Sequence, residues 1–136
     1  MHVVHLRFVQ VAIALASLIV TAGNALAEEP SYSGSSQTIT HSCDAVPSVT
    51  FGGSSNTITV TGTCKAVVVQ GSSNSLTVEA STKVVIEGSA NVAAIVATDA
   101  IKISGSGNEA TWEKALTKKR PKVSRSGVNN KVAKKA

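Results

Sequence analysis

The sequence predicts an all-β fold: a short parallel β-helix, or solenoid, with rungs of 17–19 residues that follows an N-terminal signal helix. Three observations predict it. A glycine-led tetrapeptide recurs six times at near-regular spacing, and apolar residues alternate with polar ones on both sides of each copy. The chain is rich in Ser, Thr, Gly and Val but only 3% aromatic, so its core has to be aliphatic.

Residues 1–27 are typical of a secretory signal peptide. Arg7 supplies a positive charge, an apolar run follows from Phe8 to Val20, and Ala25-Leu26-Ala27 is a small-x-small cleavage site. An uncleaved membrane anchor is the alternative, but the run is shorter than the ~20 residues that span a bilayer. We therefore expect cleavage, a mature protein without a transmembrane segment, and export to the periplasm or the extracellular space.

The mature chain is long enough for one domain. Residues 28–33 are predicted as a short linker and residues 34–132 as the repeat β-solenoid domain. The last rung, over residues 109–130, is expected to be irregular, and residues 133–136 to form a basic tail.

The tetrapeptides begin at glycines that are 19, 18, 17, 17 and 22 residues apart. In a parallel solenoid their last residues lie above one another, about 4.8 Å apart, so that the side-chain amides form a ladder. Asn also tolerates the left-handed backbone conformation that tight turns use. The predicted ladder consists of Gln37, Asn56, Asn74, Asn91, Asn108 and Asn130.

Apolar residues keep fixed offsets from each glycine, with the period of two that marks a strand with one buried face. An antiparallel β-meander or sandwich, with the tetrapeptides as hairpins, is the alternative. It does not require the same kind of residue at the same offset in every repeat, whereas stacked rungs do. The residues five after the glycine are Ile39, Ile58, Leu76, Ala93, Ala110 and Val132, and those two before it include Phe51, Val69, Ile86 and Ile103.

Cys43 and Cys64 are 21 residues apart, which is one rung plus a small insertion. Stacking therefore brings them near the Cα separation of ~4.4–6.8 Å that a disulfide needs, and the bond persists in an exported protein. Two cysteines and the distant His41 are too few ligands for a metal site. We predict a disulfide that closes the first rung, with no metal and no cofactor.

The signal peptide, the two early cysteines, the Gly-Ser-x-Asn tetrapeptides and a terminal segment with Trp112, Pro121 and Gly127 together resemble a family of short bacterial exported proteins known only as a domain of unknown function. The resemblance covers roughly residues 33–132. It implies an envelope or extracellular location and a β-helical fold, and it transfers no catalytic residue. The Lys-rich last rung departs from the family pattern.

The sequence predicts no catalytic residues and no enzyme activity. A hydrolase needs a nucleophile beside an oriented base. The single histidine of the mature chain, His41, falls at an inward offset, where a structural role is expected. The carboxylates are interpreted as solvated surface charges rather than a catalytic pair; they include Glu79, Glu87, Asp99 and Glu109. An undetected hydrolase is a low-ranked alternative.

Threonines also recur at a fixed offset. Six residues after the glycines stand Thr40, Thr59, Thr77, Ala94 and Thr111. Outward Thr columns on a solenoid are typical of ice-binding surfaces. The neighbouring column, four residues after each glycine, loses its threonines after two copies: it reads Thr38, Thr57, Ser75, Val92 and Glu109. Thr is also a common exposed strand residue, so ice binding is a second low-ranked alternative.

Charge is distributed unevenly along the chain. Residues 28–113 carry three Lys against eight acids, whereas residues 114–136 carry nine basic residues and no acid. Such a segment attracts anionic envelope polymers or lipid headgroups, and nucleic acid is a disfavoured partner because Trp112 is the only stacking platform nearby. The candidate anion-binding residues are Lys114, Lys118, Lys119, Arg120, Lys122 and Arg125.

We therefore expect an exported, non-enzymatic envelope protein. It would be a structural or binding module that docks on anionic surfaces through its cationic C-terminal segment. The main alternative is a self-assembling surface or adhesive protein in which end strands pair between chains. A solvated, partly disordered tail that keeps the protein soluble is the simplest account of the same charges.

Overall fold

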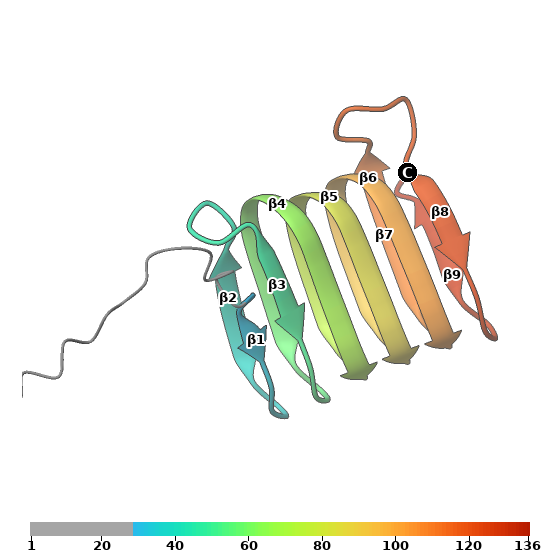
Figure 1. Ribbon diagram of the computed structural model, residues 1–136. Helices are drawn as coiled ribbons and strands as arrows, with labels where there is room; N and C mark the ends of the chain where they lie inside the picture. The colour runs from blue at the N-terminus through green and yellow to red at the C-terminus, as the bar shows by residue number, and fades with distance from the viewer. Residues whose placement is uncertain (1–28) are drawn as a thin grey trace, which may run out of the picture.

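The computed structural model describes residues 29–136, so the predicted signal peptide lies outside the described residues. The described part consists of strands and turns (Figure 1), and it holds no helix that could cross a membrane. The strands are β1 (Ser31–Tyr32), β2 (Thr38–Ser42), β3 (Ser48–Phe51), β4 (Thr57–Ser72), β5 (Ser75–Ser89), β6 (Val92–Ser106), β7 (Glu109–Lys114), β8 (Lys122–Arg125) and β9 (Lys131–Lys134).

All strand pairings in this part of the chain are parallel. The strands follow the order β1-β3-β4-β5-β6-β7-β9, with β2 also on β4 and β8 also on β6. Successive rungs therefore stack side by side along one axis (Figure 1). The predicted parallel β-solenoid is confirmed, and the antiparallel alternative is wrong because neighbouring rungs run in the same direction.

Each rung has two faces and two edges. Face A consists of the strand segments that follow a tetrapeptide, such as residues 57–60, and face B of those that precede one, such as residues 66–69. The long strands β4, β5 and β6 each bend from face A into face B. We call the edge of tetrapeptide turns the tip edge, and the opposite edge, where the chain bends at residues such as 61–65, the corner edge.

The core lies between the two faces and consists of columns of aliphatic side chains. Ile58 pairs with Leu76 and Leu76 with Ala93, at the equivalent position of each rung. Because parallel strands are about 4.8 Å apart, each of these side chains packs on its counterparts in the neighbouring rungs. The predicted columns are confirmed; their fully buried members include Phe51, Ile58, Val69, Ile86, Ile103 and Ala110.

Differences in rung length are absorbed at the corner edge. The repeat from Asn74 to Asn91 is 17 residues, while the longer preceding rung places its extra residue in a bulge between Val60 and Thr63. Larger excursions occupy residues 43–47 and 115–121. The turns of the tip edge consequently stay in phase along the solenoid.

Successive turns touch at the first residue of the tetrapeptide. A Cβ placed on Gly88 would lie 1.8 Å from the carbonyl oxygen of Gly71, with similar values along the column. No side chain fits in that space, which explains the glycine at this position.

The left-handed residue of the turn is the third one, not the Asn as predicted. Ser55, Ser73 and Ala90 have φ of 56°, 56° and 54°. The Asn that follows already belongs to the ladder of backbone hydrogen bonds: the carbonyl oxygen of Asn56 accepts from the Ser75 N–H at 2.8 Å. An extended backbone is needed for that bond, so the sharp reversal falls one residue earlier.

The Asn side chains form a buried ladder inside the tip edge. Asn91 Oδ1 accepts from both the backbone N–H and Nδ2 of Asn74, each at 3.0 Å, while Asn91 Nδ2 donates to the Gly71 carbonyl at 2.9 Å. The bonds to the neighbouring Asn recur at Asn108, where Asn91 donates, and at Asn130, where Asn108 donates. Asn56, Asn74, Asn91 and Asn108 are at most 2% exposed. Gln37 joins only through its backbone N–H, which donates to Asn56 Oδ1.

The N-terminal end is closed by the disulfide and an aromatic cluster. Cys43 and Cys64 are bonded, with Cα atoms 5.1 Å apart, as predicted. Tyr32 stacks on Phe51 with ring centroids 5.3 Å apart. His41 is buried; its Nδ1 lies 3.3 Å from Tyr32 Oη and its Nε2 lies 3.1 Å from the carbonyl oxygen of Val46. The cluster covers the first core columns.

The C-terminal rung is more regular than expected. Residues 109–114 pair in register with β6, and β8 and β9 continue both faces. The irregularity expected over residues 109–130 is thus concentrated in residues 115–121, and the tail expected at 133–136 begins inside β9. Arg125 and Lys134 are in register with Ile103 and Trp112, but both are exposed in this last rung.

Candidate functional site: a basic C-terminal end

The six predicted anion-binding residues lie together at the C-terminal end of the solenoid. Lys114 ends β7, and Lys122 and Arg125 lie in β8. The other three stand in residues 115–121, between those strands, which we call the basic loop. All six are exposed. The basic end, as defined here, comprises these six residues together with Lys131, Lys134 and Lys135.

A buried carboxylate holds the basic loop in place. Asp99, on the corner edge of β6, is only 4% exposed. Its Oδ1 accepts from the backbone N–H of Thr117 at 2.8 Å and of Lys118 at 3.2 Å, and its Oδ2 accepts from the Thr117 hydroxyl. The interpretation of Asp99 as a solvated surface charge is therefore wrong, because the loop folds over it and supplies its hydrogen bonds.

These hydrogen bonds change the acidity of Asp99. The Thr117 hydroxyl and then the Thr117 amide, with smaller backbone contributions, lower the pKa of the Asp99 carboxyl below its usual value of 3.8, against the opposing effect of burial. A carboxyl with a lowered pKa in the folded protein stabilises it fully above the unfolded pKa and loses that effect as the pH falls. The anchor is thus complete near neutral pH and weakens below about pH 4.

Asp99→Ala should free the basic loop at neutral pH. The methyl group offers no acceptor to the Thr117 hydroxyl or to the backbone N–H groups of Thr117 and Lys118. We expect faster tryptic cleavage after Lys118 and Lys119 at pH 7.5, read by mass spectrometry. Glu109→Gln, which removes the same charge from an exposed position of β7, should leave the cleavage rate unchanged. Equal rates in both variants would show that Asp99 does not hold the loop.

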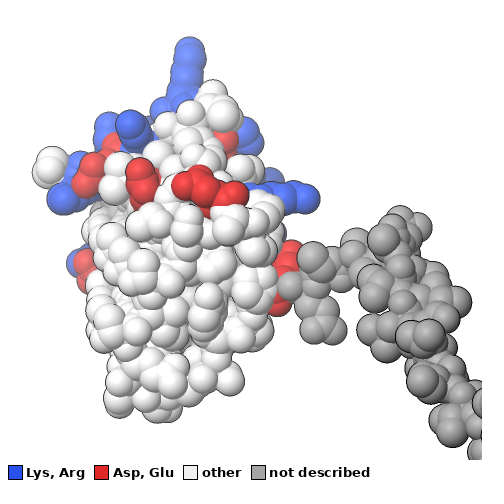
Figure 2. Space-filling view, turned by 90° about the vertical axis from the view of Figure 1, so that its left-hand side faces the viewer, with Lys and Arg blue, Asp and Glu red and all other residues white. Residues whose placement is uncertain are grey.

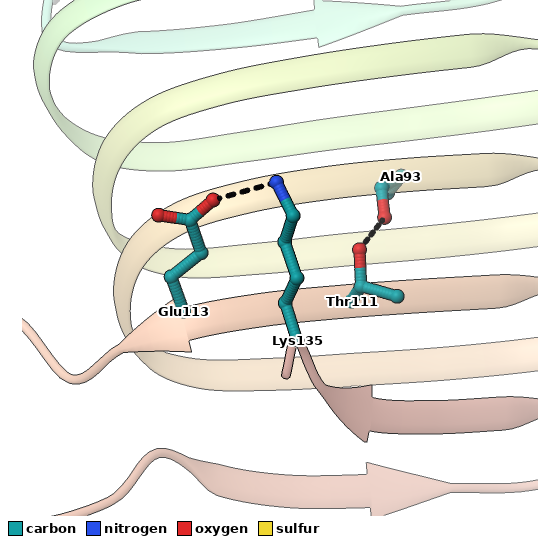
Figure 3. Close-up of polar contacts among 4 residues, drawn as sticks. All are labelled: Ala93, Thr111, Glu113 and Lys135. Atoms are coloured by element: carbon teal, nitrogen blue, oxygen red, sulfur yellow. Dashed lines mark hydrogen bonds and ion pairs between the residues drawn. The ribbon is translucent and has the colours of Figure 1, made fainter.

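Most of the basic end carries no compensating acid. In residues 29–136 the ion pair found joins Lys135 Nζ to Glu113 Oε1 at 3.0 Å (Figure 3). Lys134 lies over the Trp112 ring, 5.6 Å from its centroid. The side chains of the basic loop have no such partner within the described residues, so their charge is available to an external anion.

Seen from the N-terminal end, charge gathers toward the corner edge. In Figure 2, which looks along the solenoid from that end, the lysine, arginine and acidic side chains in view lie toward the corner edge. The turns of the tip edge hold small polar residues such as Ser54, Ser55 and Ser73, while charged residues flank the later turns, among them Glu87, Glu109 and Lys131.

Two further lysines, which the sequence analysis did not single out, lie beside the basic end. Ala100 pairs with Lys83 on one side and with Lys122 on the other, and Lys102 lies two residues further along β6. Counting offsets from the tetrapeptides could have placed them, because Lys83 and Lys122 each stand five residues before a turn glycine. A hollow of about 290 Å³ lies among the three lysines.

The other candidate groups are not assembled into a site. Glu79 Oε2 accepts from the Gly62 N–H at the corner edge, and Glu87 Oε2 accepts from Gln70 Nε2 on face B, so this carboxylate pair is not brought together. Within residues 29–136, no group of three or more His, Cys, Asp or Glu could hold a metal ion.

The outward threonines of face A form only a short array. Thr40 pairs with Thr59 and Thr59 with Thr77, but Ala94 interrupts the column. The next member, Thr111, turns its hydroxyl toward the Ala93 carbonyl oxygen at 3.5 Å (Figure 3). The array is too short for an extended regular surface.

Residues 51–100 match one protein family. Its description is "Protein of unknown function (DUF3060)". The matched stretch covers β4, β5 and the first part of β6, which form the regular centre of the solenoid. It includes Lys83 and Asp99 and ends before Lys102 and the basic loop. No curated protein and no solved structure matches the chain. The chain is thus similar to a family of unknown function, and this similarity does not assign a role to the basic end.

Proposed function

We propose that this protein is an exported, non-enzymatic binding module that docks on anionic polymers or lipid headgroups outside the cytoplasm through its basic end. The observation that carries the proposal is the anchoring of the basic loop: Asp99 fixes the backbone at Thr117 and Lys118, so the neighbouring cations are presented by an ordered loop. A tail that only aids solubility needs no buried carboxylate to hold it.

The disulfide and the signal-like N-terminus support export. A disulfide persists in oxidising compartments and is rare in the cytosol, and Cys43 and Cys64 form one. The regular rungs act as a rigid scaffold whose C-terminal end presents the cations. Rigid placement lowers the entropy cost of binding to a polyanion.

Self-assembly through the end strands is less well supported. The C-terminal edge strands β8 and β9 carry the charged residues Arg125 and Lys134 at positions that are apolar in earlier rungs. Charged side chains on an edge strand, lysine above all, are devices that prevent it from pairing with another chain. At the other end, the Gln37 side chain folds over Gly34, where an added rung would have to sit.

The following test distinguishes binding through an ordered cationic surface from binding through net charge alone. Asp99→Ala and Glu109→Gln each raise the net charge by one, so simple charge attraction predicts slightly tighter binding for both. The proposal predicts that Asp99→Ala elutes from a heparin column at lower salt than the wild type, because its loop is released, while Glu109→Gln elutes at equal or higher salt. Replacing Lys118, Lys119 and Arg120 by Ala should remove most of the retention at 0.15 M salt. Retention of that triple variant at wild-type salt would overturn the proposal.

A further inference from the structure

We infer that face B carries a second anion site, next to the basic loop, that takes the phosphate group of a phosphorylated sugar. The site consists of Lys83, Lys102 and Lys122 around the short side chain of Ala100. This inference names the chemical unit of the anionic polymer that the protein recognises, and in this respect it rests on the proposed function. Lys83 and Lys102 are not part of the basic end.

Strand register brings the three lysines together. Lys83, Ala100 and Lys122 are lateral neighbours in three successive rungs, so the two lysines lie on either side of Ala100, about 4.8 Å from it along the axis. Lys102 lies on the same outward side two residues further along β6. The arrangement is a triangle of cations, and each ammonium group supplies three donors.

The centre of the triangle is hollow because its middle residue is small. Ala100 leaves a depression of about 290 Å³, which is also lined by Ile101 and Ser124. This volume is near the lower end of small-ligand sites, which suits a single sugar ring: its C–H face rests on Ala100 while the anionic substituent meets the lysines.

The charge of the site matches a phosphate monoester. No carboxylate in the described part of the chain forms an ion pair with the three lysines, and the oxygens of the adjacent Asp99 are occupied by Thr117 and Lys118. Three uncompensated cations favour a doubly charged anion over a singly charged carboxylate, and a phosphate monoester carries about −1.5 to −2 charges at pH 7.

The probe for the test is glucosamine 6-phosphate, added to the mature protein and followed by NMR of the backbone amides. We expect saturable shifts at Ala100, Lys102 and Ser124. Glucosamine without the phosphate should give none, and inorganic phosphate should bind more weakly because it lacks the ring. The double variant Lys83→Ala/Lys102→Ala should weaken binding at least about tenfold. Lys65→Ala removes an exposed lysine of β4 near the other end and should leave the affinity unchanged.

Other outcomes would overturn the inference. These are equal binding of inorganic phosphate and the sugar phosphate, shifts confined to the basic loop, no saturation by about 10 mM probe, or amide shifts at Ala100 with phosphatidylglycerol vesicles alone. The heparin experiment keeps the two proposals apart. If heparin retention depends on the basic loop while the sugar phosphate does not bind, this inference fails and the proposed function stands; the reverse pattern leaves the face B site and removes the docking role.

Discussion

Gly88→Ala should cost more than about 4 kcal/mol of folding free energy, enough to prevent folding of a chain this size. The added Cβ would lie 1.8 Å from the carbonyl oxygen of Gly71 and 2.8 Å from its carbonyl carbon. Both atoms belong to the backbone of the preceding rung, so the overlap cannot be relieved by a side-chain rotation. The measurement is urea unfolding followed by circular dichroism.

Gly107→Ala is the matched control for that prediction. Gly107 lies in a left-handed conformation at φ 64°, and a Cβ on it would meet nothing within 4 Å. Other rungs carry Ser or Ala at this position, so the expected cost is only about 1 kcal/mol, the usual penalty for a side chain in this conformation. Similar losses in the two variants would mean that backbone conformation, and not contact between successive turns, explains the glycine column.

Asn91→Ala should destabilise the protein by roughly 3–5 kcal/mol. The change removes the acceptor of two Asn74 donors and the donor to the Gly71 carbonyl, at a site that is 2% exposed. Each buried polar group left without a partner costs about 1–3 kcal/mol. Because the loss falls in the middle of a stacked array, we expect one cooperative transition at lower urea, with the amide of Asn74 exchanging faster with solvent.

Asn130→Ala tests whether burial of the hydrogen bonds explains the large loss of stability expected for Asn91→Ala. Asn130 accepts the same two hydrogen bonds from Asn108 and donates to the Gly105 carbonyl, but it stands at the open C-terminal end. Water can replace its amide there, so the expected cost is about 1 kcal/mol. A loss as large as that of Asn91→Ala would show that the ladder acts through something other than buried hydrogen bonds.

The tip edge shows which structural features a sequence repeat can predict. The glycine spacing predicted the stacked columns, since a residue at a fixed offset can meet its counterpart only if rungs lie in register. The reason for each turn residue was harder to predict. The sequence analysis placed the left-handed residue at the Asn, whereas it is the residue before, such as Ser73 at φ 56°. A repeat reports which positions are equivalent, but not which backbone angle each one takes.

The candidate site was predicted only in part. The run of basic residues after Trp112 was plain in the sequence, and these residues do lie at one end. Asp99 was misjudged because its partners, Thr117 and Lys118, are 18 and 19 residues away and lie in a loop that follows no repeat. Lys83 and Lys102 are hard to single out from the sequence because they lie two rungs and one rung before Lys122, and only the lateral pairing of the rungs brings the three together.

The sequence by itself determined the parallel stacking, the aliphatic core and the pairing of Cys43 with Cys64, because each follows from periodicity along a single axis. Only the tertiary structure decided where the non-periodic residues go. The basic loop leaves the repeat after Lys114, and its position depends on a carboxylate from the previous rung. The hydrogen bonds between Asp99 and the basic loop join residues that follow no repeat, so residue spacing does not predict them. The ordered basic surface is therefore visible only in the folded chain.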